Sequence, residues 1–118
     1  MFKSRRPDQS LPFVTPGAGQ VEKNASPDPS CAHWRVAGRV QGVGFRWFVL
    51  QAARRHGVRG DVRNLPDGRV EIRAAGQADR VAAFLGEVRH GPQGARVDRV
   101  EQLEPDSTLR FREFDIGR

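Results

Sequence analysis

The sequence predicts an α+β fold in which two helices cover one face of an antiparallel sheet. Apolar and polar residues alternate near residues 33–40, 58–64 and 69–75, which is the pattern of half-buried strands. Residues 45–56 and 77–90 instead carry apolar positions at helical spacing. The resulting order, strand-helix-strand twice over, is that of the split βαβ, ferredoxin-like sandwich.

The first half of the fold is expected to contain a strand, a helix and a second strand. The inward face of the first strand is formed by Trp34, Val36, Gly38 and Val40. The apolar stripe of the helix is formed by Phe45, Phe48, Val49, Ala52 and Ala53. We expect Gly57 to end this helix. In the second strand, the face toward the helices is formed by Gly60, Val62 and Asn64.

The second half begins with Leu65-Pro66-Asp67-Gly68, a residue order typical of a reversal between strands. In the third strand, the inward face is formed by Val70, Ile72 and Ala74. The stripe of the second helix is formed by Val81, Phe84, Leu85 and Val88. Strict alternation fails over residues 98–104, so we expect a bulge in that strand. Phe114 and Ile116 indicate a short last strand.

One folded domain is expected at residues 31–118. Residues 1–30 hold five prolines and no apolar periodicity, which predicts a disordered N-terminal extension. The domain carries 16 of the 20 basic residues and 11 of the 14 acidic ones, so it contributes +5 of the net charge of +6. This balance favours anionic ligands, although most of the arginines fit an ordinary charged surface.

The chain shows no feature of a secreted or membrane-bound protein. Cys31 is the only cysteine, so no intrachain disulfide can form and a reducing compartment fits. No run reaches the length of a membrane span, and the N-terminal region lacks the apolar core of a signal peptide. We therefore expect a cytoplasmic protein without a membrane partner.

Residues 41–46, Gln-Gly-Val-Gly-Phe-Arg, form a candidate anion site. Gly42 and Gly44 allow the backbone to curl with its N–H groups inward, and the following helix adds unbonded N–H groups and a positive dipole end. Arg46 opposes that dipole, a cost that an anionic ligand would reverse. Such a turn is more often only a tight connection, and neither nucleotide-binding glycine fingerprint is present.

Strand direction brings Asn64 toward the same point. A right-handed crossover makes the first and second strands parallel, so the second strand ends level with the glycine turn. Asn64 shares the inward face with Val62, and a register slip of one residue would turn it outward. A simple turn or strand-end cap is the alternative role for this residue.

Two motifs closely resemble the acylphosphatase family: residues 38–46, Gly-Arg-Val-Gln-Gly-Val-Gly-Phe-Arg, and residues 62–68, Val-Arg-Asn-Leu-Pro-Asp-Gly. The resemblance covers nearly all of residues 33–118. It implies a ferredoxin-like fold and hydrolysis of small acyl phosphates to a carboxylate and inorganic phosphate. It further implies a water positioned by Asn64 and a phosphate bound by Gln41, Gly42, Val43, Gly44, Phe45 and Arg46.

One position departs from the family pattern. Asp61 stands where acylphosphatases often have an aromatic residue. Because Asp61 lies on the strand face opposite Asn64, we expect it to affect the surface or the stability before the chemistry.

The implied reaction requires few catalytic groups from the protein. The departing carboxylate has a conjugate acid of pKa about 4 and needs no general acid at neutral pH. Phosphoryl transfer then requires alignment and donors around the phosphate oxygens. The histidines and the single cysteine show no metal-ligand spacing, so we expect no metal and no cofactor.

Two other interpretations stay open. Ferredoxin-like sheets also bind RNA, and the open face here would present Arg35, Arg39, Arg59, Arg63 and Arg73. That face has no central aromatic residue for base stacking, so we do not expect a nucleic-acid partner. A non-catalytic anion sensor would keep the same turn without turnover. We expect a monomer that binds a small acyl phosphate, with phosphate or another oxyanion at the turn, and no residue indicates the acyl group.

Overall fold

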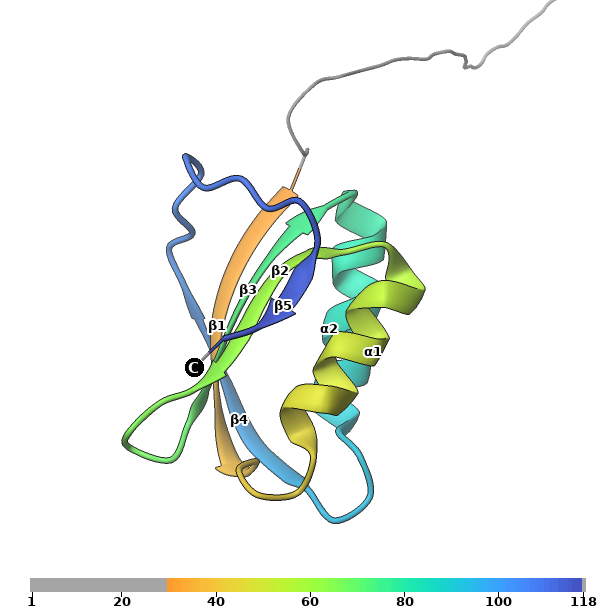
Figure 1. Cartoon of the computed structure of the whole chain (residues 1–118). Coiled ribbons are helices and arrows are strands. Elements are labelled where there is room, and N and C mark those ends of the chain that lie inside the picture. Colours follow the sequence, from red (N-terminus) through yellow and green to blue (C-terminus); the bar gives the residue numbers. More distant parts are fainter. Residues whose placement is uncertain (1–29, 118) are drawn as a thin grey trace, which may run out of the picture.

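Two helices lie against one face of a five-stranded sheet in the computed structural model, which describes residues 30–117 (Figure 1). The elements in chain order are β1 (Ser30–Arg39), α1 (Phe45–His56), β2 (Arg59–Asn64), β3 (Val70–Gly76), α2 (Ala78–His90), β4 (Arg96–Leu103) and β5 (Phe114–Ile116). The strand order across the sheet is β4-β1-β3-β2-β5. The expected ferredoxin-like arrangement is confirmed.

The element boundaries follow the sequence pattern closely, except at β1. The helix α1 spans the predicted residues and ends at Gly57, whose φ of 66° lies in the left-handed region. β1 begins at Ser30, because its backbone pairing with β3 continues as far as Ser30 and Gly76. Ser30 therefore belongs to the sheet and not to the expected disordered extension. The rest of that extension, residues 1–29, lies outside the described residues.

The last strand makes the sheet mixed, whereas a purely antiparallel sheet was expected. β4, β1, β3 and β2 are antiparallel to their neighbours, but β5 runs parallel to β2, with Gly60 opposite Phe114 and Val62 opposite Ile116. The connection from β4 leads from one edge of the sheet to the other (Figure 1). An apolar pattern marks residues as a strand but does not identify the neighbouring strand, so the sequence could not predict this direction.

The bulge expected in β4 is present at its start. The register shifts between Ala37 and Gly38, whose partners are Arg99 and Val97, so Asp98 is the extra residue. Gly38 was expected on the inward face but is exposed at this point.

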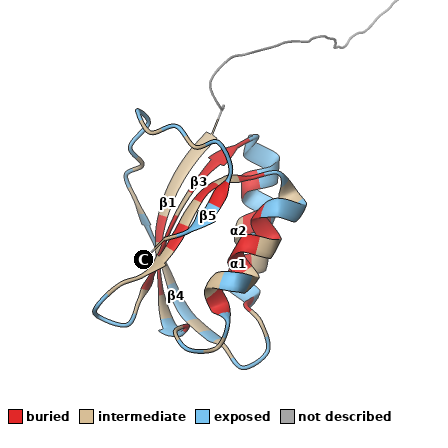
Figure 2. Ribbon diagram, in the orientation of Figure 1, coloured by how far each residue is buried: buried red, intermediate tan, exposed pale blue. Residues whose placement is uncertain are grey.

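The core fills the space between the sheet and the two helices (Figure 2). The predicted inward faces and helix stripes supply its largest fully buried side chains: Phe45, Phe84, Ile72, Val36, Val40, Val49, Val62, Val70 and Val88. Neither helix of residues 30–117 has the length and apolar content needed to cross a bilayer.

Glu71 is buried on the sheet face that points away from the helices. Its carboxylate accepts hydrogen bonds from His33 at 2.9 Å, Arg63 at 2.6 and 2.9 Å, and Arg35 at 3.3 Å. Burial alone raises the pKa of Glu71, but these donors outweigh it and lower the pKa to about 2. Alternation placed Glu71 on this face, and the surrounding long side chains cover it.

Asp61 has a partner on the same face. Its carboxylate pairs with the guanidinium of Arg73, which also lies over the ring of Phe111 at 5.6 Å. The residue that departs from the family pattern therefore takes part in a surface ion pair, on the side of β2 away from Asn64.

Candidate active site

The connection between β1 and α1 forms the expected glycine turn. Gly42 and Gly44 have φ of 77° and 75°, in the left-handed region that glycine adopts most readily. Gly44 is the N-cap of α1 and offers no side chain to bond the first N–H groups, and the first turn has no acidic residue. The start of α1 therefore presents unbonded donors and the positive end of the dipole. Both favour an anion.

A pocket of about 200 Å³ opens at the start of this helix. Its lining consists of Val40, Gly42, Gly44, Phe45, Arg46, Trp47, Asn64 and Ile116. Five residues expected at the site, among them Arg46 and Asn64, thus surround one cavity.

Gln41 and Val43 were expected at the site but do not line this pocket. The Gln41 Nε2 donates to the carbonyl oxygens of Leu65 and Arg69, both at 2.9 Å, so its side chain ties the turn to the β2–β3 connection. Val43 is half-buried and packs against the core. An anion in the pocket could meet these two residues only through their backbone N–H groups.

Asn64 ends β2 with its side chain on the helix side of the sheet. Its Oδ1 is buried and accepts no hydrogen bond from the described residues. Leaving such an oxygen unpaired costs about 1–3 kcal/mol, so a hydrogen-bond donor in the pocket would be stabilised there. Asn64 pairs with Val70, which in turn pairs with Val36, near the point where β1 enters the glycine turn.

Arg46 is half-buried in the first turn of α1. Its Nη1 lies 3.5 Å from the carbonyl oxygen of Gly117, at the limit of hydrogen bonding. Among residues 30–117, no carboxylate forms an ion pair with it. This differs from Arg63 and Arg73, which are held by Glu71 and Asp61. The Arg46 charge is therefore available to a ligand.

Besides the core residue Val40, two other pocket residues had not been expected at the site from the sequence. Trp47 belongs to α1 but lies outside its apolar stripe, and a large aromatic residue on the polar side of a helix was a usable signal. Ile116 reaches the pocket through the parallel pairing of β5 with β2, which no sequence pattern indicated.

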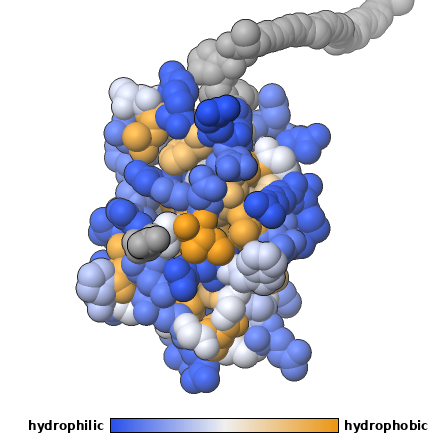
Figure 3. Space-filling view, viewed as in Figure 1, coloured by the Kyte–Doolittle hydropathy of each residue, from blue (hydrophilic) through white to orange (hydrophobic). Residues whose placement is uncertain are grey.

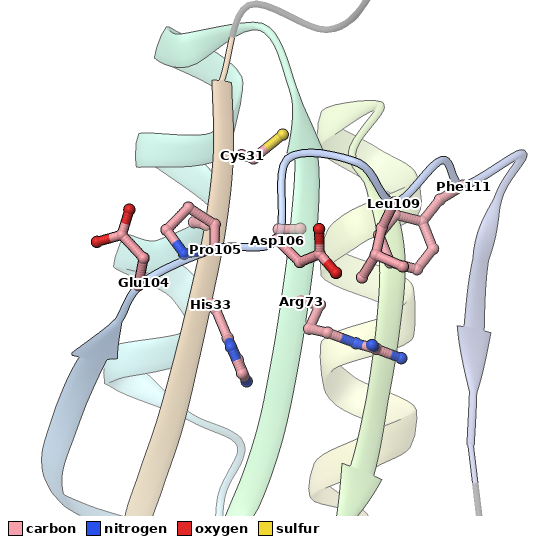
Figure 4. Close-up of a pocket in the computed structure, with 10 residues that line it drawn as sticks. Cys31, His33, Arg73, Glu104, Pro105, Asp106, Leu109 and Phe111 are labelled. Atoms are coloured by element: carbon pink, nitrogen blue, oxygen red, sulfur yellow. The ribbon is translucent and has the colours of Figure 1, made fainter.

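A larger cavity of about 290 Å³ lies on the open face, between the sheet and the β4–β5 connection (Figure 4). It is lined by Cys31, Ala32, His33, Arg73, Ala74, Glu104, Pro105, Asp106, Leu109 and Phe111. The main hydrogen-bond donors of this cavity already have partners within the protein, since Arg73 pairs with Asp61 and His33 with Glu71. The cavity also lacks a helix start. We therefore place the anion site in the smaller pocket.

The described residues offer no metal centre. Among residues 30–117, no three His, Cys, Asp or Glu side chains lie close enough together to hold an ion. The expectation of metal-free chemistry stays a prediction.

Known proteins share this fold and these motifs. Residues 32–116 match the family model described as Acylphosphatase. A curated acylphosphatase of Thermococcus kodakarensis is 57% identical over 70 residues, covering 59% of this chain and 77% of that protein. One from Methylococcus capsulatus is 48% identical over 86 residues, covering 73% and 94%. The crystal structure of acylphosphatase from Bacillus subtilis has a TM-score of 0.71 at 36% identity, covering 75% of this chain and 98% of that one. The chain therefore belongs to the acylphosphatase family of enzymes.

Proposed function

We propose that this protein hydrolyses the carboxyl-phosphate bond of small acyl phosphates, releasing a carboxylate and inorganic phosphate. The observation that supports this most directly is the pocket shared by Arg46 and Asn64. Among residues 30–117, the Arg46 guanidinium has no ion pair and the Asn64 Oδ1 accepts no hydrogen bond. Membership of the acylphosphatase family supports the substrate class.

The phosphate group would bind at the glycine turn. Backbone N–H groups of residues 41–46 and the Arg46 guanidinium would donate to its oxygens, as the unbonded helix start favours. A guanidinium about 4 Å from a phosphate oxygen attracts it by about 4 kcal/mol at an effective dielectric constant near 20, before desolvation is subtracted. Because no carboxylate of residues 30–117 pairs with Arg46, none of them would compete with the ligand for this attraction.

Asn64 would position the attacking water. Its Oδ1 accepts a hydrogen bond from the water, which fixes the water on one side of the phosphorus atom. In-line attack forms the new P–O bond from water while the bond from phosphorus to the acyl oxygen breaks. The carboxylate leaves without a proton, and the water's proton passes to the phosphate product or to solvent.

The donors at the turn would act most strongly as the reaction proceeds. In a loose transition state the charge spreads over the three equatorial phosphate oxygens. N–H groups and a guanidinium that are already oriented toward these oxygens need no rearrangement at that moment. Stabilisation of this charge, together with alignment of the water, would account for catalysis without a general acid or a metal.

The proposal includes a monomer that acts on a small molecule in the cytoplasm, without a nucleic-acid or membrane partner. The single Cys31 fits a reducing compartment. Arg35 and Arg63 are paired with Glu71, which reduces the positive charge at the centre of the open face. This pairing favours the hydrolase over the RNA-binding interpretation.

Release of phosphate from acetyl phosphate by the purified full-length protein tests the proposal. We expect hydrolysis well above the rate in buffer, with no effect of a chelator and a large loss in Arg46→Ala. Binding of inorganic phosphate without any hydrolysis would instead indicate an anion sensor. Salt-sensitive binding of single-stranded RNA without hydrolysis would indicate a nucleic-acid-binding module.

A further inference from the structure

Two large, exposed apolar residues line the phosphate pocket. Trp47 is 58% exposed and Ile116 is 39% exposed, and they are the exposed large hydrophobic residues of the described chain. Both line the pocket that contains Arg46 and Asn64. The space-filling view shows apolar surface interrupting a mostly hydrophilic face on which β5 and α1 lie (Figure 3).

The two side chains come from different elements. Trp47 follows Arg46 directly on α1, whereas Ile116 lies on β5, opposite Val62 of β2. Neither belongs to the buried core cluster, so the fold does not account for their position. Single exposed apolar residues are ordinary on protein surfaces, but these two converge on one charged cavity.

Apolar surface does not stabilise the phosphate end of a substrate. Phosphate oxygens call for N–H donors and positive charge, which the glycine turn and Arg46 supply. The acyl group, in contrast, is separated from phosphorus by a single bridging oxygen, so it must lie in or beside the pocket whenever the phosphate is bound there. An apolar surface there fits the acyl group.

We infer that Trp47 and Ile116 form an acyl-group subsite, which favours aromatic and bulky aliphatic acyl phosphates over acetyl phosphate. The inference rests on the proposed function, since it assigns the second half of the same substrate. Trp47 presents the larger exposed fraction and an aromatic ring that can stack on a flat acyl group. Covering about 50 Å² of apolar acyl surface would strengthen binding about tenfold.

The charges around the pocket point to the same class of substrate. Arg46 is the one cationic side chain in its lining among the described residues. In the proposed function, the phosphate group of the substrate takes up this charge. An acyl group that carries its own carboxylate, such as succinyl, would therefore meet apolar surface without a second cation. Uncharged apolar acyl groups are expected to be preferred over anionic ones.

Hydrolysis of benzoyl, acetyl and succinyl phosphate by matched variants tests the subsite. Trp47→Ala should lower kcat/KM about tenfold for benzoyl phosphate and about twofold for acetyl phosphate, and Trp47→Phe should restore most of the loss. Ile116→Ala should act in the same direction with a smaller effect. Taking the ratio of variant to wild type for each substrate removes the difference in leaving-group reactivity.

Leu109→Ala is the control for general effects of removing an apolar side chain. Leu109 is half-buried and lines the cavity on the open face, away from the phosphate pocket. Its variant should leave the benzoyl-to-acetyl ratio at the wild-type value. Equal losses on both substrates in Trp47→Ala, or a wild-type preference for succinyl phosphate, would overturn the subsite.

Non-hydrolysable ligands separate this inference from the proposed function. Phenylphosphonate should bind the wild-type protein about tenfold more tightly than methylphosphonate by calorimetry, and Trp47→Ala should remove most of the difference. If the protein hydrolyses none of the three substrates, the proposed function fails, and the phosphonate ratio still decides the subsite. A ratio near one overturns the subsite.

Discussion

The side-chain amide of Gln41 donates a 2.9 Å hydrogen bond to the carbonyl oxygen of Leu65, the residue that follows Asn64. The same nitrogen donates to the carbonyl oxygen of Arg69. The glycine turn that surrounds the phosphate pocket is therefore fixed to the end of the strand that carries Asn64. Phosphate binding by the backbone N–H of Gln41 stays a prediction, whereas its side chain connects the glycine turn to the β2–β3 connection.

Gln41→Leu should slow turnover through geometry. Loss of both bonds lets Asn64 shift relative to Arg46, and small misplacements of aligned groups are costly in rate. We expect kcat for acetyl phosphate to fall about tenfold, with an inhibition constant for phosphate changed less than about threefold. Gln102→Leu, at an exposed position of β4, is the matched control. A wild-type kcat in Gln41→Leu would show that the backbone positions the turn without this side chain.

Asn64→Ala should make the protein slower and more stable. Removing the water-positioning oxygen is expected to lower kcat about 100-fold, with a smaller effect on phosphate binding. The unpaired buried oxygen disappears at the same time, which should raise the free energy of unfolding by about 1 kcal/mol. Steady-state kinetics and urea unfolding measure the two effects. A less stable variant with normal turnover would identify Asn64 as a strand-end cap.

Arg46→Ala should abolish most phosphate binding while leaving the fold intact. Its guanidinium makes one long bond to the Gly117 carbonyl and has no ion pair among the described residues, so little stability depends on it. We expect the inhibition constant for phosphate to rise about 100-fold and turnover to fall at least as much. Arg46→Lys should recover only part of the phosphate affinity, because an ammonium group cannot donate two parallel hydrogen bonds to the phosphate as a guanidinium can.

Arg54→Ala, at an exposed position of the same helix, serves as the control for Arg46. It removes one positive charge from the protein without touching the pocket. Equal weakening of phosphate binding in both variants would attribute binding to net charge, and raising the salt concentration would then abolish it.

The lowered pKa of Glu71 predicts that the folded protein loses stability in acid. The pKa of this carboxyl is lowered from 4.5 to about 2, so the stability that it contributes is fully present above pH 4.5. That stability is lost as the pH falls from 4.5 toward 2, and it amounts to about 3 kcal/mol at about 1.4 kcal/mol per pKa unit. Glu71→Gln should lower stability at pH 7 and flatten the decline below pH 4.5.

Urea unfolding between pH 7 and 2.5 measures this effect, with the exposed Glu113→Gln as control. The control should keep the wild-type slope with pH. A Glu71→Gln protein that loses stability with acid as steeply as the wild type would show that other carboxylates govern the transition.

The predictable parts of this structure were those set by local periodicity and chain handedness. The bounds of α1 follow from its apolar stripe and Gly57, and the inward direction of Asn64 follows from strand parity and the right-handed crossover. The contacts of Gln41 could not be predicted, because they join residues 24 and 28 positions apart through loop geometry. The burial of Glu71 likewise depends on long side chains from neighbouring strands, which alternation does not describe.

The parallel position of β5 has a consequence for the order in which activity arises during folding. β5 follows every other described element, yet it supplies Ile116 to the pocket, and the nearby Gly117 bonds an arginine 71 positions earlier in the chain. Contacts of such high sequence separation form late, since long loops must close first. A nascent chain would thus carry the glycine turn well before it could catalyse. The onset of acyl phosphate hydrolysis should therefore report completed folding.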